Sequence, residues 1–86
     1  MTKIEKILNQ VLRGTSDVNI DFDDLRSLLH QLGFEERIKG SHHIFWKKEV
    51  VEIINLQPKR SKVKLYQVKQ IRNVIVKYKL GDLSGE

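Results

Sequence analysis

The sequence predicts one α+β domain in which a three-stranded antiparallel sheet packs against helices on one face. A chain of 86 residues has room for a single modest core. Apolar residues recur at helical spacing in three segments, and three short runs rich in β-branched and aromatic residues lie between the last two segments. The predicted element order is therefore α-α-β-β-β-α, over a single domain that covers residues 1–86.

The first predicted helix covers residues 2–13. Its apolar residues recur three and four positions apart, and this pattern stops at Gly14. A polar connector is expected over residues 15–19, and the core of the domain from about residue 21 to about residue 80. The helix is an addition to that core, and the sequence is compatible both with packing on the sheet and with exchange between two chains.

The other two helices each carry one apolar stripe. The second is expected to begin after Asp21, a residue type that suits the N-cap position, and to end at Gly33. The last is expected to run from about Leu65 until Gly81. The simplest arrangement packs both stripes on one face of the sheet and leaves the other face to water or to a partner.

Three strands are expected between these two helices. Turn signals separate the segments FEERIK, HHIFWKK and VVEIINLQ, which cover residues 34–39, 42–48 and 50–57. Side chains alternate across a strand, so His42, Ile44 and Trp46 share one face of the second strand, and His43 and Phe45 share the other. Counting apolar residues favours the face of Ile44 and Trp46 as the buried one.

Basic residues are concentrated in the second half of the chain. Residues 37–79 carry twelve Lys or Arg and two acidic residues, whereas residues 1–36 carry four basic and seven acidic residues. Such an asymmetry is typical of a protein with a polyanionic partner such as nucleic acid, an acidic protein or a membrane surface. The alternative is a solvated basic face that binds nothing.

Several classes of protein are disfavoured. Without cysteine the chain forms no disulfide and no thiolate metal site. The remaining histidine, His30, is expected in a helix behind the sheet, and metal ligands normally come as three or four residues at fixed spacing, so no metal or cofactor is expected. No apolar run exceeds three residues, and the start MTKIEKILNQ lacks the apolar region of a secretory signal. We therefore expect a soluble cytoplasmic protein without a membrane segment.

The succession LRSLLHQLGFEERIKGSHHIF resembles the HicA family of bacterial toxin–antitoxin systems. The likeness extends from about Asp24 to Tyr78, and GSHHIF is its most specific part. It implies an α-β-β-β-α fold similar to double-stranded RNA-binding domains, ribonuclease activity on mRNA, and inhibition by a HicB-like antitoxin. It also implies His42 as the catalytic residue, His43 as the second choice, and Phe45 rather than its neighbours in the core.

One feature departs from the family pattern. The third strand of the family commonly ends in a Pro-x-His type of motif before a basic loop, whereas this chain reads NLQPKRSKVK, with Pro58 and no histidine. The resemblance therefore implies a single catalytic histidine. Ile44 and Trp46 would then form an exposed apolar strip beside it, where an antitoxin could dock.

The chemistry expected of such a protein needs no metal. RNA carries its own nucleophile, the 2′-hydroxyl, and a histidine that titrates near neutral pH can act as general base or acid. Cationic side chains would hold phosphates, and Trp46 or Tyr66 could stack on bases. The residues expected to bind RNA are Lys39, Gly40, Ser41, Lys47, Lys48, Lys59, Arg60, Lys62, Lys64, Lys69 and Arg72.

Two other functions are compatible with the same sequence. A non-catalytic RNA-binding module of this architecture would bind RNA in a salt-sensitive way without cutting it. A protein-interaction domain whose basic face meets an acidic partner would have no affinity for RNA at moderate salt.

Overall fold

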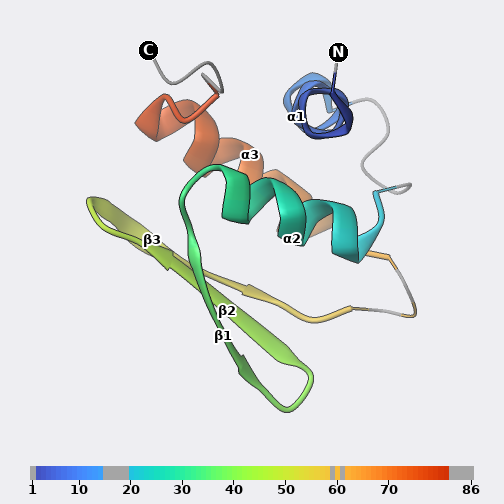
Figure 1. Ribbon diagram of the computed structural model, residues 1–86, viewed down its shortest axis with the longest axis vertical. Helices are drawn as coiled ribbons and strands as arrows, with labels where there is room; N and C mark the ends of the chain where they lie inside the picture. Colours follow the sequence, from blue (N-terminus) through green and yellow to red (C-terminus); the bar gives the residue numbers. More distant parts are fainter. Residues whose placement is uncertain (1, 15–19, 59, 61, 82–86) are drawn as a thin grey trace.

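The computed structural model describes residues 2–14, 20–58, 60 and 62–81. Its elements are α1 (Lys3–Arg13), α2 (Phe22–Gln31), β1 (Glu35–Lys39), β2 (His42–Lys47), β3 (Val50–Leu56) and α3 (Leu65–Tyr78) (Figure 1). The predicted α+β class and the order α-α-β-β-β-α are confirmed. The connector expected over residues 15–19 lies outside the described residues. None of the described helices combines the length and the apolar character needed to cross a membrane.

The three strands form one antiparallel sheet in the order β1-β2-β3, so β1 and β3 are its edges. Glu36 pairs with Phe45, which in turn pairs with Ile54 on β3. Figure 1 shows α2 and α3 on the same side of the sheet, as the sequence predicts. We call the face toward these helices the inner face and the opposite one the outer face.

The inner face carries Phe45. Counting apolar residues predicted that the face of Ile44 and Trp46 is the buried one, and this prediction is wrong. Phe45, Ile54 and Leu56 are fully buried, whereas Trp46 is exposed on the outer face and Ile44 is half-buried there. The reason is the register: Ile54 and Leu56 face the helices, and pairing with β3 places Phe45 beside them. The arrangement implied by the family resemblance is the observed one.

Helix α1 forms a further layer on α2 and α3, on the side of these helices that faces away from the sheet (Figure 1). Its buried residues are Ile7, Leu8 and Val11. At its start, the Thr2 hydroxyl accepts a hydrogen bond from the Glu5 amide at 3.2 Å, and the Glu5 carboxylate accepts one from the Thr2 amide at 3.4 Å. This capping box satisfies backbone donors that the helix leaves unpaired. Of the two placements that the sequence allowed, packing on the sheet does not occur.

The other end of α1 is held by α3. Arg72 Nε donates a hydrogen bond to the carbonyl oxygen of Val11 at 2.7 Å. Gly14 ends the helix with a φ of 70°, and a Cβ at this position would lie 3.1 Å from the guanidinium. A positive charge at the C-terminus of a helix also complements its dipole. Arg72, one of the residues expected to bind RNA, thus uses its guanidinium to cap α1.

The packing of α1 predicts different losses of stability for two neighbouring substitutions. Val11 is fully buried and Leu12 is 38% exposed. We expect Val11→Ala to lower the free energy of unfolding by about 1–3 kcal/mol through lost burial and a residual cavity. Leu12→Ala, the matched control, should change it by less than about 0.5 kcal/mol. Urea denaturation of both variants measures this, and equal, small effects would show that α1 is not part of the core.

Candidate active site

His42 lies on the outer face at the start of β2, where it is exposed and pairs with Lys39 across the β1–β2 hairpin. Its Nδ1 is 3.3 Å from Oδ1 of Asn55 on β3. An amide oxygen only accepts hydrogen bonds, so this contact favours the tautomer with the proton on Nδ1. In the neutral ring Nε2 then keeps its lone pair, and His42 is a proton acceptor at that atom.

The backbone of Asn55 is bonded in turn to the start of α3. The buried Gln67 side chain donates from Nε2 to the carbonyl oxygen of Asn55 at 3.1 Å, and its Oε1 accepts from the backbone amide of Lys64 at 3.3 Å. Both ends of this amide are therefore used, as a buried polar group requires. Gln67 therefore connects the first turn of α3 to β3, the strand whose Asn55 contacts the ring of His42.

A shallow cavity of about 280 Å³ lies next to His42. The sheet side contributes His42, Ile53, Asn55 and Gln57, and α3 contributes Tyr66, Gln67 and Gln70. Apart from His42 the lining is uncharged and consists mostly of amides. Sequence reasoning missed the four amide residues, because an amide carries no signature in the sequence and the packing of α3 on β3 brings them together.

His43 occupies a different environment on the inner face. Its side chain is only 13% exposed, and Nδ1 lies 2.6 Å from Oε2 of Glu36. The edge of the ring meets Phe22 at 4.8 Å between ring centroids. Of the two histidines expected at the site, His42 is accessible to a substrate, and His43 is held between the sheet and α2.

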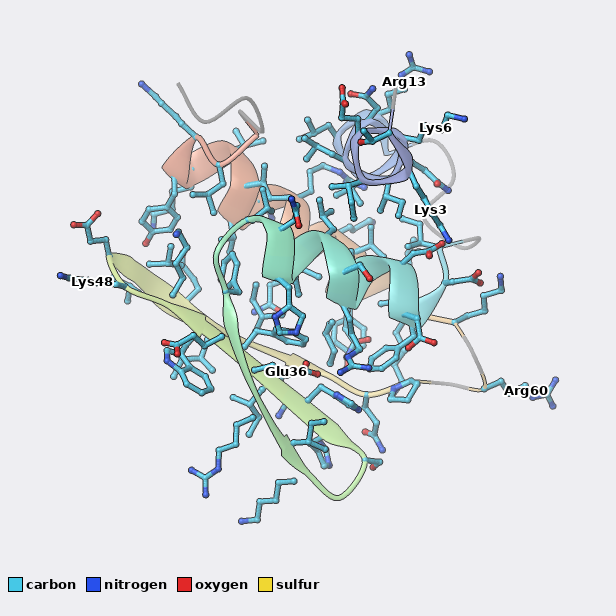
Figure 2. The ribbon with its side chains drawn as sticks, viewed as in Figure 1. Lys3, Lys6, Arg13, Glu36, Lys48 and Arg60 are labelled. Atoms are coloured by element: carbon cyan, nitrogen blue, oxygen red, sulfur yellow. The ribbon has the colours of Figure 1, made fainter. Side chains whose placement is uncertain are left out.

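Glu36 accepts hydrogen bonds from three side chains, and Figure 2 shows it between β1 and α2. Besides His43, Arg26 donates from Nε at 2.8 Å and from Nη2 at 2.9 Å, and His30 contributes Nε2 at 2.7 Å. Burial of Glu36 favours a raised pKa, but the hydrogen bonds from Arg26, His43 and His30 outweigh it and lower the pKa from 4.5 to about 2. We call these four residues the Glu36 cluster; the sequence analysis did not find it.

The structure brings three of the predicted RNA-binding residues next to His42. Lys39 is its cross-strand partner, and Gly40 and Ser41 form the turn between them. Gly40 has a φ of 61°, a left-handed conformation that glycine adopts readily. The Ser41 hydroxyl accepts a hydrogen bond from Gln57 Nε2 at 3.2 Å.

Two predicted lysines lie at the other end of β2. Lys47 is half-buried beside Gly33, where an added Cβ would come within 2.6 Å of its Nζ. Figure 2 shows Lys48 at the far turn of the sheet, opposite the hairpin tip that carries His42. Neither lysine is placed to contact a phosphate held by His42.

The remaining predicted basic residues are spread over several surfaces. Lys62 forms an ion pair with Asp21, which lowers the pKa of that carboxyl through the hydrogen bond and the charge. Arg60 and Lys69 are exposed and Lys64 is the N-cap residue of α3. Lys59 lies outside the described residues.

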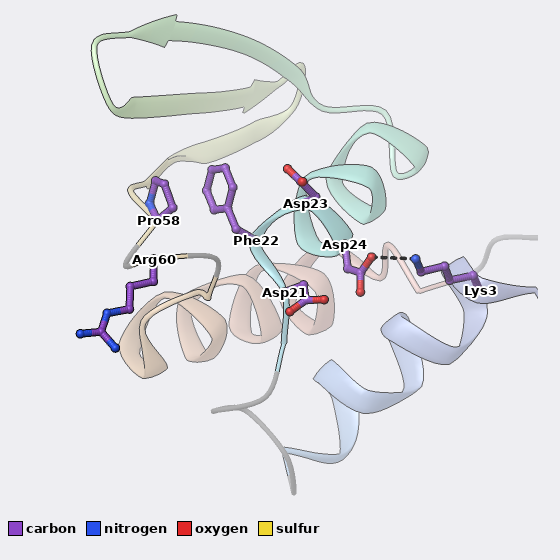
Figure 3. A pocket seen from close by; sticks show the side chains of 7 residues that line it. All are labelled: Lys3, Asp21, Phe22, Asp23, Asp24, Pro58 and Arg60. Carbon is purple, nitrogen blue, oxygen red and sulfur yellow. Dashed lines mark ion pairs between the residues drawn. The ribbon is translucent and has the colours of Figure 1, made fainter.

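A larger cavity of about 510 Å³ lies at the start of α2, and neither histidine of the adjacent pair lines it (Figure 3). Asp21, Asp23 and Asp24 at the start of α2 line it, together with Arg60 and with Lys3, whose Nζ pairs with Asp24 at 3.1 Å. Three carboxylates disfavour a phosphate there. Among the described residues, no group of three or more side chains is arranged to hold a metal ion.

Comparison with known protein families identifies a match over most of the chain. The family model described as HicA toxin of bacterial toxin–antitoxin systems matches residues 22–78. These residues include α2, the sheet and α3, and therefore both the His42 cavity and the Glu36 cluster. A search of the curated proteins and a search of the solved structures each found no significant match.

The Glu36 cluster predicts acid sensitivity. Because the pKa of Glu36 is near 4.5 in the unfolded chain and about 2 in the folded one, its stabilisation is complete above about pH 5 and is lost as the pH falls toward 2. The side chain is 7% exposed, so this stabilisation amounts to about 3 kcal/mol at most. Glu36→Gln should therefore lower stability at pH 7 and flatten its decline below pH 5.

Urea denaturation between pH 2.5 and pH 7 tests this expectation. Glu35→Gln is the matched control, because Glu35 is the exposed neighbour on the same strand. If Glu36→Gln retains the pH profile of the parent, the cluster does not hold an ionised carboxylate.

Proposed function

The chain belongs to the HicA family of toxins from bacterial toxin–antitoxin systems, and on this premise we propose that it is a metal-independent endoribonuclease that cuts mRNA. The observation that carries the proposal is the environment of His42: an exposed imidazole, oriented by Asn55 so that Nε2 is free, at the rim of a cavity. It lies within the part of the chain that matches the family. Since mRNA is the proposed substrate, the proposed site of action is the cytoplasm.

In the proposed reaction His42 is the single histidine that transfers a proton. Nε2 accepts the proton of a ribose 2′-hydroxyl, the 2′-oxygen forms a bond to the adjacent phosphorus, and the bond from phosphorus to the 5′-oxygen breaks. The leaving 5′-oxygen takes a proton from water, and the hydroxide that forms takes the proton from Nε2, which returns His42 to its neutral form. The products are a 2′,3′-cyclic phosphate and a 5′-hydroxyl, and no oxidant or metal is required.

The charge that develops on the phosphate needs a cation nearby. Lys39 is suited to this role because it faces His42 across the hairpin and is exposed. His43 is not assigned to catalysis in this proposal, because its Nδ1 is bound to Glu36 and its ring packs on Phe22. It supports the inner face of the same strand instead.

One observation favours a second candidate, an RNA-binding module of the same fold that does not cut. The residues lining the His42 cavity include no second histidine and no carboxylate. A chain with one weak proton acceptor and no partner acid could hold RNA without turnover. Cleavage in EDTA separates the two candidates.

A toxin of such a system has an antitoxin partner, and we propose that a HicB-like antitoxin covers the outer face. No described helix or strand covers four apolar side chains on this face: Ile44, Trp46, Val51 and Ile53. Val51 is 84% exposed and Ile53 63%. His42 lies on the same face, so a protein that buries these residues would also close access to the imidazole.

The catalytic assignment predicts the effect of removing each histidine. His42→Ala should reduce RNA cleavage in EDTA by about 10²- to 10⁴-fold, the usual contribution of a proton-transfer residue, and leave thermal unfolding unchanged. His43→Ala should lower the free energy of unfolding, because it removes a donor from Glu36. Parent-like cleavage by a folded His42→Ala protein would contradict the assignment, and absence of cleavage by the parent with retained RNA binding would favour the second candidate.

The proposed antitoxin interface on the outer face predicts a selective loss of binding. Val51→Asp places a charge on the most exposed apolar residue of the proposed interface and should weaken binding of the protein encoded by the neighbouring open reading frame by about 10-fold or more. Val76→Asp is the matched control, since Val76 is also an exposed valine but lies on α3. Calorimetric titration with each variant measures the affinity. Equal binding by parent and Val51→Asp would place the antitoxin elsewhere.

A further inference from the structure

Two side chains of the His42 cavity have no bonding role within the part of the chain that the structure describes. Tyr66 and Gln70 lie one turn apart on α3, and both line the cavity. Neither the Tyr66 hydroxyl nor the Gln70 amide has a side-chain hydrogen bond to another described residue. Tyr66 is 63% exposed, so its ring is not placed there to fill the core.

The other amides of the cavity are already engaged in holding the protein together. Both ends of Gln67 are used within the fold, and Gln57 donates to Ser41. Asn55 directs its oxygen at His42. Tyr66 and Gln70 are therefore the polar side chains of the lining for which the structure gives no hydrogen bond within the described residues.

These two groups suit a nucleobase better than a phosphate. A phosphate is bound by cations, and the cavity lining contains no lysine or arginine. A base offers a flat π face that stacks on an aromatic ring, and an edge with donors and acceptors that an amide can pair with. In an RNA duplex these faces are stacked and the edges are paired, so the matching ligand is an unpaired base.

We propose that Tyr66 and Gln70 form a base-binding subsite next to His42, with Tyr66 stacking on one unpaired base and Gln70 hydrogen-bonding to its edge. The inference rests on the proposed function in one respect, because it assigns the substrate of the His42 site as single-stranded RNA. The subsite selects where the chain is cut: the base held by α3 places a neighbouring ribose at Nε2.

The test measures binding separately from cleavage. Eight-nucleotide RNAs with 2′-O-methyl groups lack the nucleophile and cannot be cut, and each carries one abasic position. Their dissociation constants are measured by fluorescence anisotropy with the parent, Tyr66→Ala, Tyr66→Phe and Gln70→Ala. Gln31→Ala is the control, since Gln31 is an exposed amide at the end of α2.

We expect the loss of one particular base to weaken binding by the parent and by Tyr66→Phe about 5-fold or more, as stacking on one aromatic ring does. In Tyr66→Ala the same abasic position should not weaken RNA binding any further. Gln70→Ala should bind the four bases at that position with more similar affinities than the parent, and Gln31→Ala should match the parent.

The outcomes distinguish this inference from the proposed reaction. The subsite is overturned if the protein does not bind the RNAs, or if the abasic position weakens binding equally in the parent and in Tyr66→Ala. This holds even if the parent cuts unmodified RNA. A loss of affinity at the abasic position that depends on Tyr66 supports the subsite, even if the parent does not cut RNA.

Discussion

The burial of Phe45 between the sheet and the pair α2 and α3 determines which histidine of β2 lies on the outer face. Side chains alternate along a strand with a period of two, so Phe45 in the core places His43 on the inner face and His42 on the outer one. A slip of one residue would exchange the two rings. Full burial of an aromatic side chain contributes about 1.5–3 kcal/mol, which opposes such a slip. The bond from His43 to Glu36 adds to the same preference.

The second constraint comes from α3. Gln67 joins the start of this helix to the carbonyl oxygen of Asn55, and Tyr78 near its end accepts from the Val51 amide at 3.2 Å and donates to Glu52 at 2.7 Å. Both contacts are made with β3, an edge strand that has unpaired backbone groups. They fix the helix along the strand, and this position brings Tyr66 and Gln70 to the side of His42.

Periodicity in the sequence was sufficient to predict the elements and their order, because each helix has an apolar stripe and each strand a short β-branched run. It was not sufficient to predict the buried face of β2, since Ile44 and Trp46 are as apolar as the residue that is buried. Composition also could not separate the roles of the basic residues. Arg72 caps α1, Lys62 pairs with Asp21, and the acceptors they meet are distant in sequence. The family resemblance identified His42, but the amides around it are brought together only by tertiary packing.

The order of the strands also bears on the solubility of the folded protein. Contacts from α3 occupy part of the β3 edge, so β1 presents the more open row of backbone donors and acceptors. Open edges invite intermolecular strand pairing and, from there, fibril growth. This edge is only five residues long and reads EERIK, and four of those residues are charged. Short edge strands with charged side chains are poor templates for strand pairing, which disfavours aggregation through β1.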